Sequence, residues 1–452
     1  MRAGGRKRHH GRRPMRDASR GACLRDGGSR GKGDERNPDG DGDQTQDRPH
    51  GLQPCDSRLR ILCVGRKVFA SSALSWPQVI ARRLRRHHLL EPAPAEQMVQ
   101  AVSDVCGIHA QVAASAELMV GLRVRGITRQ DVRNALWRDR TLVKTVGHRG
   151  TLHLLPRAEV PYWMAANRLR FAAEERRLDR SGIKPEELEA AIRAIADVVG
   201  PEPISRPDLE REIEARIGGW ATATNQGWMG TYRNWPMALG WAAALGLVCY
   251  GPGDGGHSTF VRLRDWATWR EVDSEEGGRF VVRHFLRAYG PSTQAEFSRW
   301  FSFVPPLVKR LFDSLADELV EVSVEGEKRW ALASDQDLLP ADAANGVNLL
   351  PHFDVFVVGS HPRDELIEPG SPLKNVVPGT AAPFAVVLHG GRVAGVWHRR
   401  PKGKRLVVRV DAYWPLRRKQ RAVLEEQAAR VAQIVERECD VEFGPVELRP
   451  HA

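Results

Sequence analysis

The feature that most constrains this fold is a recurring order in which a helix is followed directly by two short apolar strands. In the first copy, Thr128 to Asp131 has the Ser/Thr-x-x-acid pattern that opens a helix. Apolar strands at 142–146 and 151–155 follow, joined by the turn His148-Arg149-Gly150. A helix that runs straight into a hairpin forms the second half of a winged helix, so we expect one here.

The same order appears twice more, with negligible sequence identity between the copies. In the second copy the expected helices and strands are 206–217, 235–245, 247–250 and 259–263. In the third copy they are 281–289, 307–315, 319–324 and 328–332. The sequence therefore predicts an α+β fold with three tandem winged-helix modules, at 68–158, 159–272 and 273–340.

After Pro340 the pattern changes to strands separated by turn residues. The expected strands are 355–358, 385–389, 393–397, 405–410 and 441–443, with a helix at about 416–435 before the last one. We expect these residues, 341–452, to form a small β-barrel or curled sheet, with a C-terminal helix, that braces the winged helices.

The positive charge of the chain is concentrated at its N-terminus. Residues 1–67 hold 17 Lys+Arg and 9 Asp+Glu, a net charge of +8, whereas the whole chain has +12. This stretch has almost no apolar residues to bury, so we expect a disordered basic tail. It is a nonspecific nucleic-acid arm, a solvated tail, or upstream sequence translated from a start assigned too early. The remaining 385 residues are nearly neutral, so any DNA-binding surface must be a local patch.

Composition argues against several protein classes. The six cysteines form no Cys-x-x-Cys or paired Cys/His spacing, which argues against a disulfide scaffold and a zinc site. The longest apolar-rich uncharged run, 235–250, is too short to cross a membrane, and the N-terminus lacks the apolar core of a signal peptide. We expect a cytoplasmic protein.

His109-Ala110-Gln111 is the sharpest candidate for chemistry. It follows Gly107, which ends a helix, so the backbone should be extended and the side chains of His109 and Gln111 should share one face. An imidazole and an amide on one face could hold a water between them. The alternative is that both side chains satisfy backbone groups at a helix junction.

Other polar residues are candidates for DNA contact. A basic hairpin could bind phosphates, or could be a solvated edge whose charges prevent strand pairing; its cations are Arg399, Arg400, Lys402, Lys404 and Arg405. His148 and Arg149 form a second basic turn. Asp354 is a lone carboxylate that either caps the chain or takes part in chemistry. The helix at 235–245 carries no charge, which suggests a buried helix rather than a reader of the DNA groove.

Several motifs in the same order resemble AlkZ-like winged-helix DNA glycosylases, from about Leu74 to the end. They are Leu74-Ser75-Trp76 with the Arg-rich run after it, Gly107 to Gln111, Arg149 to Leu154, Leu349 to Asp354, and the hairpin at 391–397. The resemblance implies three winged helices braced by a β-barrel, and excision of alkylated purines from duplex DNA, including unhooking of interstrand crosslinks. The family's catalytic motif is usually Gln-x-Gln or Gln-x-Asp, whereas here His109 precedes Gln111.

The resemblance implies a nucleoid-associated protein, which we expect to be a monomer, and a chemistry that needs no metal or cofactor and suits a small polar site. N7-alkylation makes the purine a cation, so it leaves without a strong acid, and the enzyme must position a water beside an oxocarbenium-like sugar. Gln111 would orient that water and a neutral His109 would accept its proton; with the ordinary pKa near 6.5, the rate should fall below about pH 6. Two alternatives remain open: a non-catalytic winged-helix DNA-binding or regulatory protein, and a protein-binding scaffold.

Overall fold

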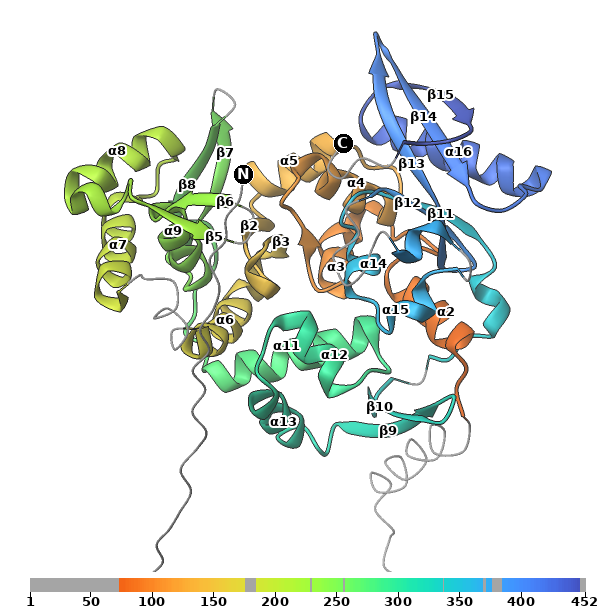
Figure 1. Ribbon diagram of the computed structural model, residues 1–452, viewed down its shortest axis with the longest axis horizontal. Helices are drawn as coiled ribbons and strands as arrows, with labels where there is room; N and C mark the ends of the chain where they lie inside the picture. Colours follow the sequence, from red (N-terminus) through yellow and green to blue (C-terminus); the bar gives the residue numbers. More distant parts are fainter. Residues whose placement is uncertain are drawn as a thin grey trace, which may run out of the picture. The chain divides into compact units, whose positions relative to one another are not determined.

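The computed structural model describes residues 73–174, 184–227, 230–254, 257–335, 337–368, 371–375 and 384–447 (Figure 1). The basic tail predicted at 1–67 lies outside the described residues. The fold below is built from these ranges alone.

The first helix-and-hairpin segment forms as the sequence predicts. The Asp131 carboxylate accepts a hydrogen bond from the Thr128 backbone N–H at 2.7 Å, and the Thr128 hydroxyl accepts one from the Gln130 N–H at 3.2 Å. This capping box opens the helix that leads into the hairpin. The elements of the segment are α2 (Trp76–Arg86), α3 (Met98–Asp104), β1 (Ile108–His109), α4 (Ala113–Arg123), α5 (Arg129–Trp137), β2 (Leu142–Val146) and β3 (Leu152–Pro156).

The second segment is arranged around the uncharged helix α9. Its Trp235 and Leu239 are buried together with its alanines, so the expectation of a buried helix is confirmed. The Ser205 hydroxyl accepts a hydrogen bond from the Asp208 N–H at 3.3 Å and caps the preceding helix α8. The elements are α6 (Val160–Glu174), α7 (Pro185–Val198), β4 (Ile204–Ser205), α8 (Arg206–Ile217), β5 (Thr224–Gly227), β6 (Gly230–Arg233), α9 (Trp235–Ala244), β7 (Val248–Asp254), β8 (His257–Arg262) and α10 (Leu263–Trp266).

The hairpins of these two segments join in one six-stranded sheet. Its strand order is β1-β3-β2-β7-β8-β4, and β2 meets β7 where Lys144 pairs with Tyr250. The sheet therefore crosses the boundary that the sequence predicted at residues 158/159.

The third segment packs three helices against a hairpin. Thr293 and Glu296 form the predicted capping box, with the Glu296 N–H donating to the Thr293 hydroxyl at 3.1 Å. Leu74, at the start of the described chain, adds a parallel bridge to Val324 at the edge of this hairpin. The elements are α11 (Ser274–Tyr289), α12 (Gln294–Phe301), α13 (Pro305–Asp313), β9 (Leu319–Val324) and β10 (Glu327–Leu332).

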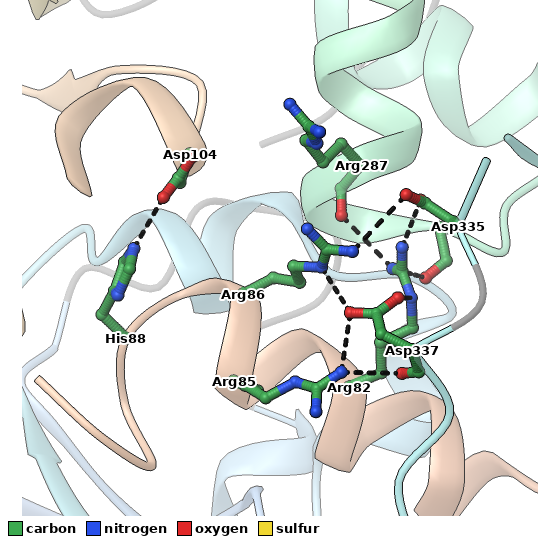
Figure 2. Close-up of polar contacts among 9 residues, drawn as sticks. Arg82, Arg85, Arg86, His88, Asp104, Arg287, Asp335 and Asp337 are labelled. Carbon is green, nitrogen blue, oxygen red and sulfur yellow. Dashed lines mark hydrogen bonds and ion pairs between the residues drawn. The ribbon is translucent and has the colours of Figure 1, made fainter. Parts of the chain in front are cut away.

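Arginines on α2 fasten the first segment to the chain that follows β10. Figure 2 shows Arg82, Arg85 and Arg86 pointing at two carboxylates. Asp337 receives Arg86 Nε at 2.6 Å and Arg85 Nη2 at 2.8 Å, and Arg82 forms an ion pair with the buried Asp335. The Arg-rich face of α2 is thus largely used inside the protein, because these carboxylates neutralise it.

The C-terminal strands form an open sheet, which fits the curled-sheet alternative rather than a closed barrel. The order is β11-β12-β13-β14-β15, and the edge strands β11 and β15 do not pair within the described ranges. α16 packs against both edge strands, and its Gln427 side chain accepts a hydrogen bond from the Leu349 N–H at 2.6 Å and donates one to the Val347 carbonyl. This helix satisfies the free edge of β11, which barrel closure would otherwise do. The strands and the helix are β11 (Val347–Leu350), β12 (Val386–His389), β13 (Arg392–Lys402), β14 (Arg405–Ala412), α16 (Arg418–Ile434) and β15 (Glu438–Phe443).

One correction concerns residues 355–358, which the sequence predicted as a strand. They form the short helix α14 (Val355–Gly359), and α15 (Arg363–Leu366) follows. The Asp354 carboxylate accepts a hydrogen bond from the Phe356 N–H at 2.9 Å, so this side chain caps the helix. Every residue of α14 is buried, which is why its sequence reads as a continuous apolar run.

The cores of the segments are continuous rather than separate. One apolar cluster contains Val143 and Leu155 of the first hairpin, Val261 of the second, and Phe285 and Trp300 of the third segment. All described residues belong to one compact unit.

Candidate active site

The extended conformation predicted after Gly107 is present at Ile108 and His109, which form β1, whereas Gln111 lies beyond the end of this strand. Gly107 turns the chain with φ of +84°, and a Cβ at this position would lie 2.5 Å from a Leu155 methyl carbon, so only glycine fits. β1 then pairs antiparallel with β3, with His109 opposite His153, and the Ala110 N–H donates to the Leu152 carbonyl at 2.7 Å.

His109, on β1, and Gln111, just after it, lie at different depths. The His109 side chain is buried, with 7% of the residue exposed, whereas Gln111 is exposed. The Gln111 amide oxygen accepts a hydrogen bond from the Leu152 backbone N–H at 3.4 Å. The side chain of Gln111 therefore satisfies one backbone group, as the alternative interpretation expected, and this bond also fixes which way its amide points. His109 Nδ1 is sealed from solvent and has no hydrogen-bond partner within the described part of the chain.

Aromatic rings enclose the His109 imidazole. The Phe353 ring centroid lies 5.4 Å from it, and the His153 ring lies 5.5 Å away at an interplanar angle of 87°. His153 in turn lies 4.1 Å from His148, whose ring stacks on Trp300 at 4.3 Å. The sequence analysis did not single out His153, Phe353 or Trp300 as site residues. Only the strand register places His153 opposite His109, and the register is not readable from either segment alone.

Burial keeps these imidazoles neutral. Desolvation, followed by the nearby positive charge of Arg149, lowers the pKa of His109 to about 4. Burial also holds the pKa values of His148 and His153 well below the ordinary range. All three rings are therefore uncharged at neutral pH, and the pKa of His109 is far lower than the ordinary value assumed from sequence.

In the basic turn at 148–150, His148 is buried and Arg149 is half-buried. His148 is only 2% exposed and stacked on Trp300, so its ring faces the protein interior, which argues against the predicted DNA contact. Arg149 is half-buried and adopts a positive φ of 56°. Its charge acts on His109, which places a cation beside the candidate catalytic group.

Two further arginines lie near Arg149 and were missed in the sequence. Arg299 is on α12 and Arg363 is on α15, where the Arg363 Nη2 donates to the Val358 carbonyl at 2.8 Å. Burial, and then the charges of Arg149 and Arg299, lower the pKa of Arg363 to about 10. Arg149, Arg299 and Arg363 come from three different elements, so no sequence motif marks them as a group.

The structure divides the basic hairpin at the β13–β14 turn. Arg400, Lys402 and Lys404 are exposed. Arg405 instead donates to Asp440 at 2.8 Å and forms an ion pair with Glu438, both on β15. Strand β15 thus neutralises part of the patch that the sequence presents as uniformly basic.

Arg399, at the base of the same hairpin, is half-buried and lines a hollow of about 280 Å³. Val112, directly after Gln111, lines this hollow from β1's side, and Phe353 lines it from the loop before α14. Because Phe353 also packs on His109, residues far apart in the sequence converge here. Val112 is 42% exposed, which is unusual among the large apolar residues of this chain.

Asp354 has a structural role. It is fully buried and forms a two-pronged ion pair with the equally buried Arg123, at 2.7 and 2.9 Å. Arg123 closes α4, and α4 begins two residues after Gln111. The pair therefore joins α4 to the loop that carries Phe353, and the capping interpretation of Asp354 is the one the contacts support.

No three His, Cys, Asp or Glu side chains in the described ranges are grouped where they could share a metal ion. None of the helices in those ranges combines the length and the apolarity that crossing a membrane requires.

Comparison with known proteins identifies the family. The family model described as DNA glycosylase AlkZ-like matches residues 102–434. A curated protein named interstrand DNA cross-link repair glycosylase, from Streptomyces sahachiroi, is 32% identical over 335 residues, which are 72% of this chain and 87% of the relative. The solved structure of Streptomyces sahachiroi DNA glycosylase AlkZ aligns with a TM-score of 0.68 at 26% identity, over 82% of this chain and all of that one. The chain belongs to the AlkZ-like family of DNA glycosylases.

Proposed function

We propose that this DNA glycosylase hydrolyses the N-glycosidic bond of N7-alkylated purines in duplex DNA and unhooks interstrand crosslinks made through such bases. The observation that carries the proposal is a buried neutral imidazole, His109 on β1, and a tethered amide, Gln111, two residues further along the chain. The name of the Streptomyces relative supports the crosslink substrate.

The reaction needs a positioned water and an acceptor for its proton. The water oxygen bonds to C1′ of the sugar while the C1′–N9 bond breaks, and the electron pair of that broken bond neutralises the cationic purine. His109 Nε2 takes the water's proton and later passes it to solvent. Gln111, whose amide is held by the Leu152 N–H, presents its remaining lone pair and its amide protons to the water.

Cations on two sides of this strand would hold the DNA. Arg400, Lys402 and Lys404 at the hairpin tip are proposed to contact phosphates across the duplex, with Arg399 above the hollow beside Phe353. Arg149, supported by Arg299 and Arg363, is proposed to bind the phosphate next to the reacting sugar.

The three helix-and-hairpin segments are proposed to be winged helices at 68–158, 159–272 and 273–340, with 341–452 as their brace. We further propose that the chain acts as a monomer in the cytoplasm, at the nucleoid, and that the basic tail is dispensable for folding. A chain shortened to begin at Val68 should keep its thermal midpoint and lose only nonspecific DNA affinity. A midpoint lower by several degrees would mean that the tail packs on the fold.

The test of function is excision from a duplex with one N7-methylguanine, scored as abasic sites under single-turnover conditions. The wild-type chain should excise the base, and Gln111→Ala should be slower by about 10²-fold, the scale of losing one positioned catalytic group. His109→Gln, which restores the family's usual residue, should keep substantial activity. A second duplex, crosslinked through N7 of two guanines, tests unhooking.

The matched control is Gln130→Ala, an exposed glutamine on α5. It should excise at the wild-type rate, and both glutamine variants should bind the lesion duplex equally. A folded Gln111→Ala with full activity would make the motif structural. A wild-type chain that binds DNA and excises neither substrate would favour the non-catalytic DNA-binding alternative.

A further inference from the structure

A row of polar side chains crosses the sheet beneath the candidate site. His109 on β1 pairs with His153 on β3, and His153 pairs with Thr145 on β2. Residues directly opposite one another in an antiparallel sheet point to the same face, so these three side chains lie side by side. His109 Nδ1, His153 Nε2 and Thr145 Oγ1 are all sealed from solvent and without a partner in the described ranges. A buried donor or acceptor without a partner is costly, so the neighbouring His109 and His153 nitrogens call for an explanation.

The protonation of His153 is fixed by its own backbone. Its Nδ1 lies 2.9 Å from the Thr151 carbonyl oxygen, and because a carbonyl can only accept, Nδ1 carries the proton. A neutral imidazole has one N–H, so Nε2 of His153 bears a lone pair. Gly147 makes room for this arrangement, since a Cβ there would lie 2.7 Å from His153 Nδ1.

We infer that His153 is a positioning residue that fixes the tautomer of His109. Its Nε2 lone pair accepts a hydrogen bond from His109 Nδ1–H when the two rings turn toward each other. As they stand, the rings are perpendicular with centroids 5.5 Å apart and leave both nitrogens without a partner, so closing this gap would pair them. His109 is then held as the Nδ1–H tautomer, and its Nε2 is free to accept a proton from the attacking water. In the opposite tautomer, His109 Nε2 would carry a proton and could accept none.

This inference rests on the proposed function for its chemistry, but its structural part can be read without activity. Specific ¹⁵N labelling of histidine in the full chain, with His109 assigned from a His109→Gln spectrum, reports which ring nitrogen is protonated. We expect Nδ1–H for His109 in the wild-type chain at pH 7.5, and loss of that preference in His153→Phe. A wild-type His109 protonated at Nε2 would overturn the inference, whatever the activity.

The kinetic arm uses three variants on the N7-methylguanine duplex. His153→Phe keeps the ring but has no acceptor, and should lower kcat by about 10- to 100-fold with little change in KM, as when a histidine loses its orienting partner. His153→Gln supplies an amide oxygen and should recover most of the rate. The control is Thr145→Val, on the opposite side of His153, which removes an unpaired buried hydroxyl and should leave kcat unchanged.

These arms separate the two proposals. If the wild-type chain excises the base and folded His153→Phe keeps its kcat, the positioning role fails while the proposed function stands. If the wild-type chain excises nothing, the proposed function fails, and the histidine spectrum alone decides whether His153 sets the tautomer.

Discussion

At the scale of single residues, burial gives His109 the electrostatic behaviour of a glutamine. The family's usual residue at this position is uncharged at every pH. His109 has a pKa of about 4, so it is also uncharged across the physiological range. Unlike an amide, however, a neutral imidazole retains a basic nitrogen, so the substitution adds a proton acceptor without adding charge.

The pH dependence of excision should follow this low pKa. Because protonation removes the His109 lone pair, the single-turnover rate should stay flat from pH 8 to about pH 5 and fall toward pH 4. The sequence alone, with the ordinary histidine pKa near 6.5, predicted that the rate would fall below about pH 6. Burial and the charge of Arg149 lower the pKa of His109, so the fall is expected at lower pH. His109→Gln should lack the acid limb, which makes it the control. A midpoint near 6.5 in the wild-type profile would mean that the imidazole is solvated.

Residue-level prediction succeeded where one short segment holds the information. Gly107 ends a helix, so the extended backbone at Ile108 and His109 follows from local rules. His153 could not be found in this way, because its position opposite His109 depends on the pairing of strands 44 residues apart. The depth of His148 was equally hidden, since the ring that covers it, Trp300, belongs to another segment.

At the scale of elements, a buried ion pair positions the loop that carries Phe353 beside His109. Arg123 and Asp354 connect α4 to the start of α14, and Phe353 between them and His109 forms part of the enclosure. The sequence predicted a strand at 355–358 because Val-Phe-Val-Val is typical of one. The Asp354 cap and burial on all sides overrode this preference, and tertiary contacts of that kind do not appear in a local pattern.

Removing Asp354 should be among the most costly single changes in the chain. Asp354→Ala leaves the Arg123 guanidinium buried and uncompensated, so urea unfolding should show a loss of about 3–5 kcal/mol. Asp317→Ala, an exposed aspartate after α13, should change stability by less than about 0.5 kcal/mol. A loss below about 1 kcal/mol for Asp354→Ala would mean that Arg123 finds another partner.

The β13–β14 hairpin should contribute to DNA binding mainly through its exposed tip. Lys402→Ala with Lys404→Ala should weaken binding to any duplex and reduce the salt slope by roughly 0.9 log unit for each phosphate that is no longer bound. Arg405→Ala should change the slope less, because Glu438 and Asp440 already neutralise that guanidinium. Fluorescence anisotropy over a series of salt concentrations measures both the affinity and the salt slope. Equal slopes for the wild-type chain and all variants would mean that the hairpin is a solvated edge that binds no phosphate.

At the scale of the whole molecule, the segments that the sequence presents in tandem share a sheet and a core. The order of helices and strands was predictable, since caps and turns mark them locally. The Lys144–Tyr250 bridge and the mixed apolar cluster were not, because they join residues more than 100 positions apart.

Buried neutral histidines should make the fold sensitive to mild acid. The pKa values of His87, His109, His148 and His153 are all lowered, chiefly by burial. The unfolded chain, with ordinary values near 6.5, therefore binds more protons below that pH, and stability falls as pH drops from about 6.5 toward 4. Each histidine contributes up to about 1.4 kcal/mol per pH unit in this window. Urea midpoints at pH 7.5 and 5.0 should differ clearly, and equal midpoints would contradict neutral burial.

The shared sheet also limits how this chain can be taken apart. A fragment ending at residue 158 would leave β2 without its neighbour β7, and would expose Val143 and Leu155, whose packing partners come from the later segments. An open strand edge beside exposed apolar side chains is a template for association between copies. The segment that carries the candidate site is therefore not expected to fold or act when it is expressed alone. Fusion partners should be attached at the ends of the chain rather than between its segments.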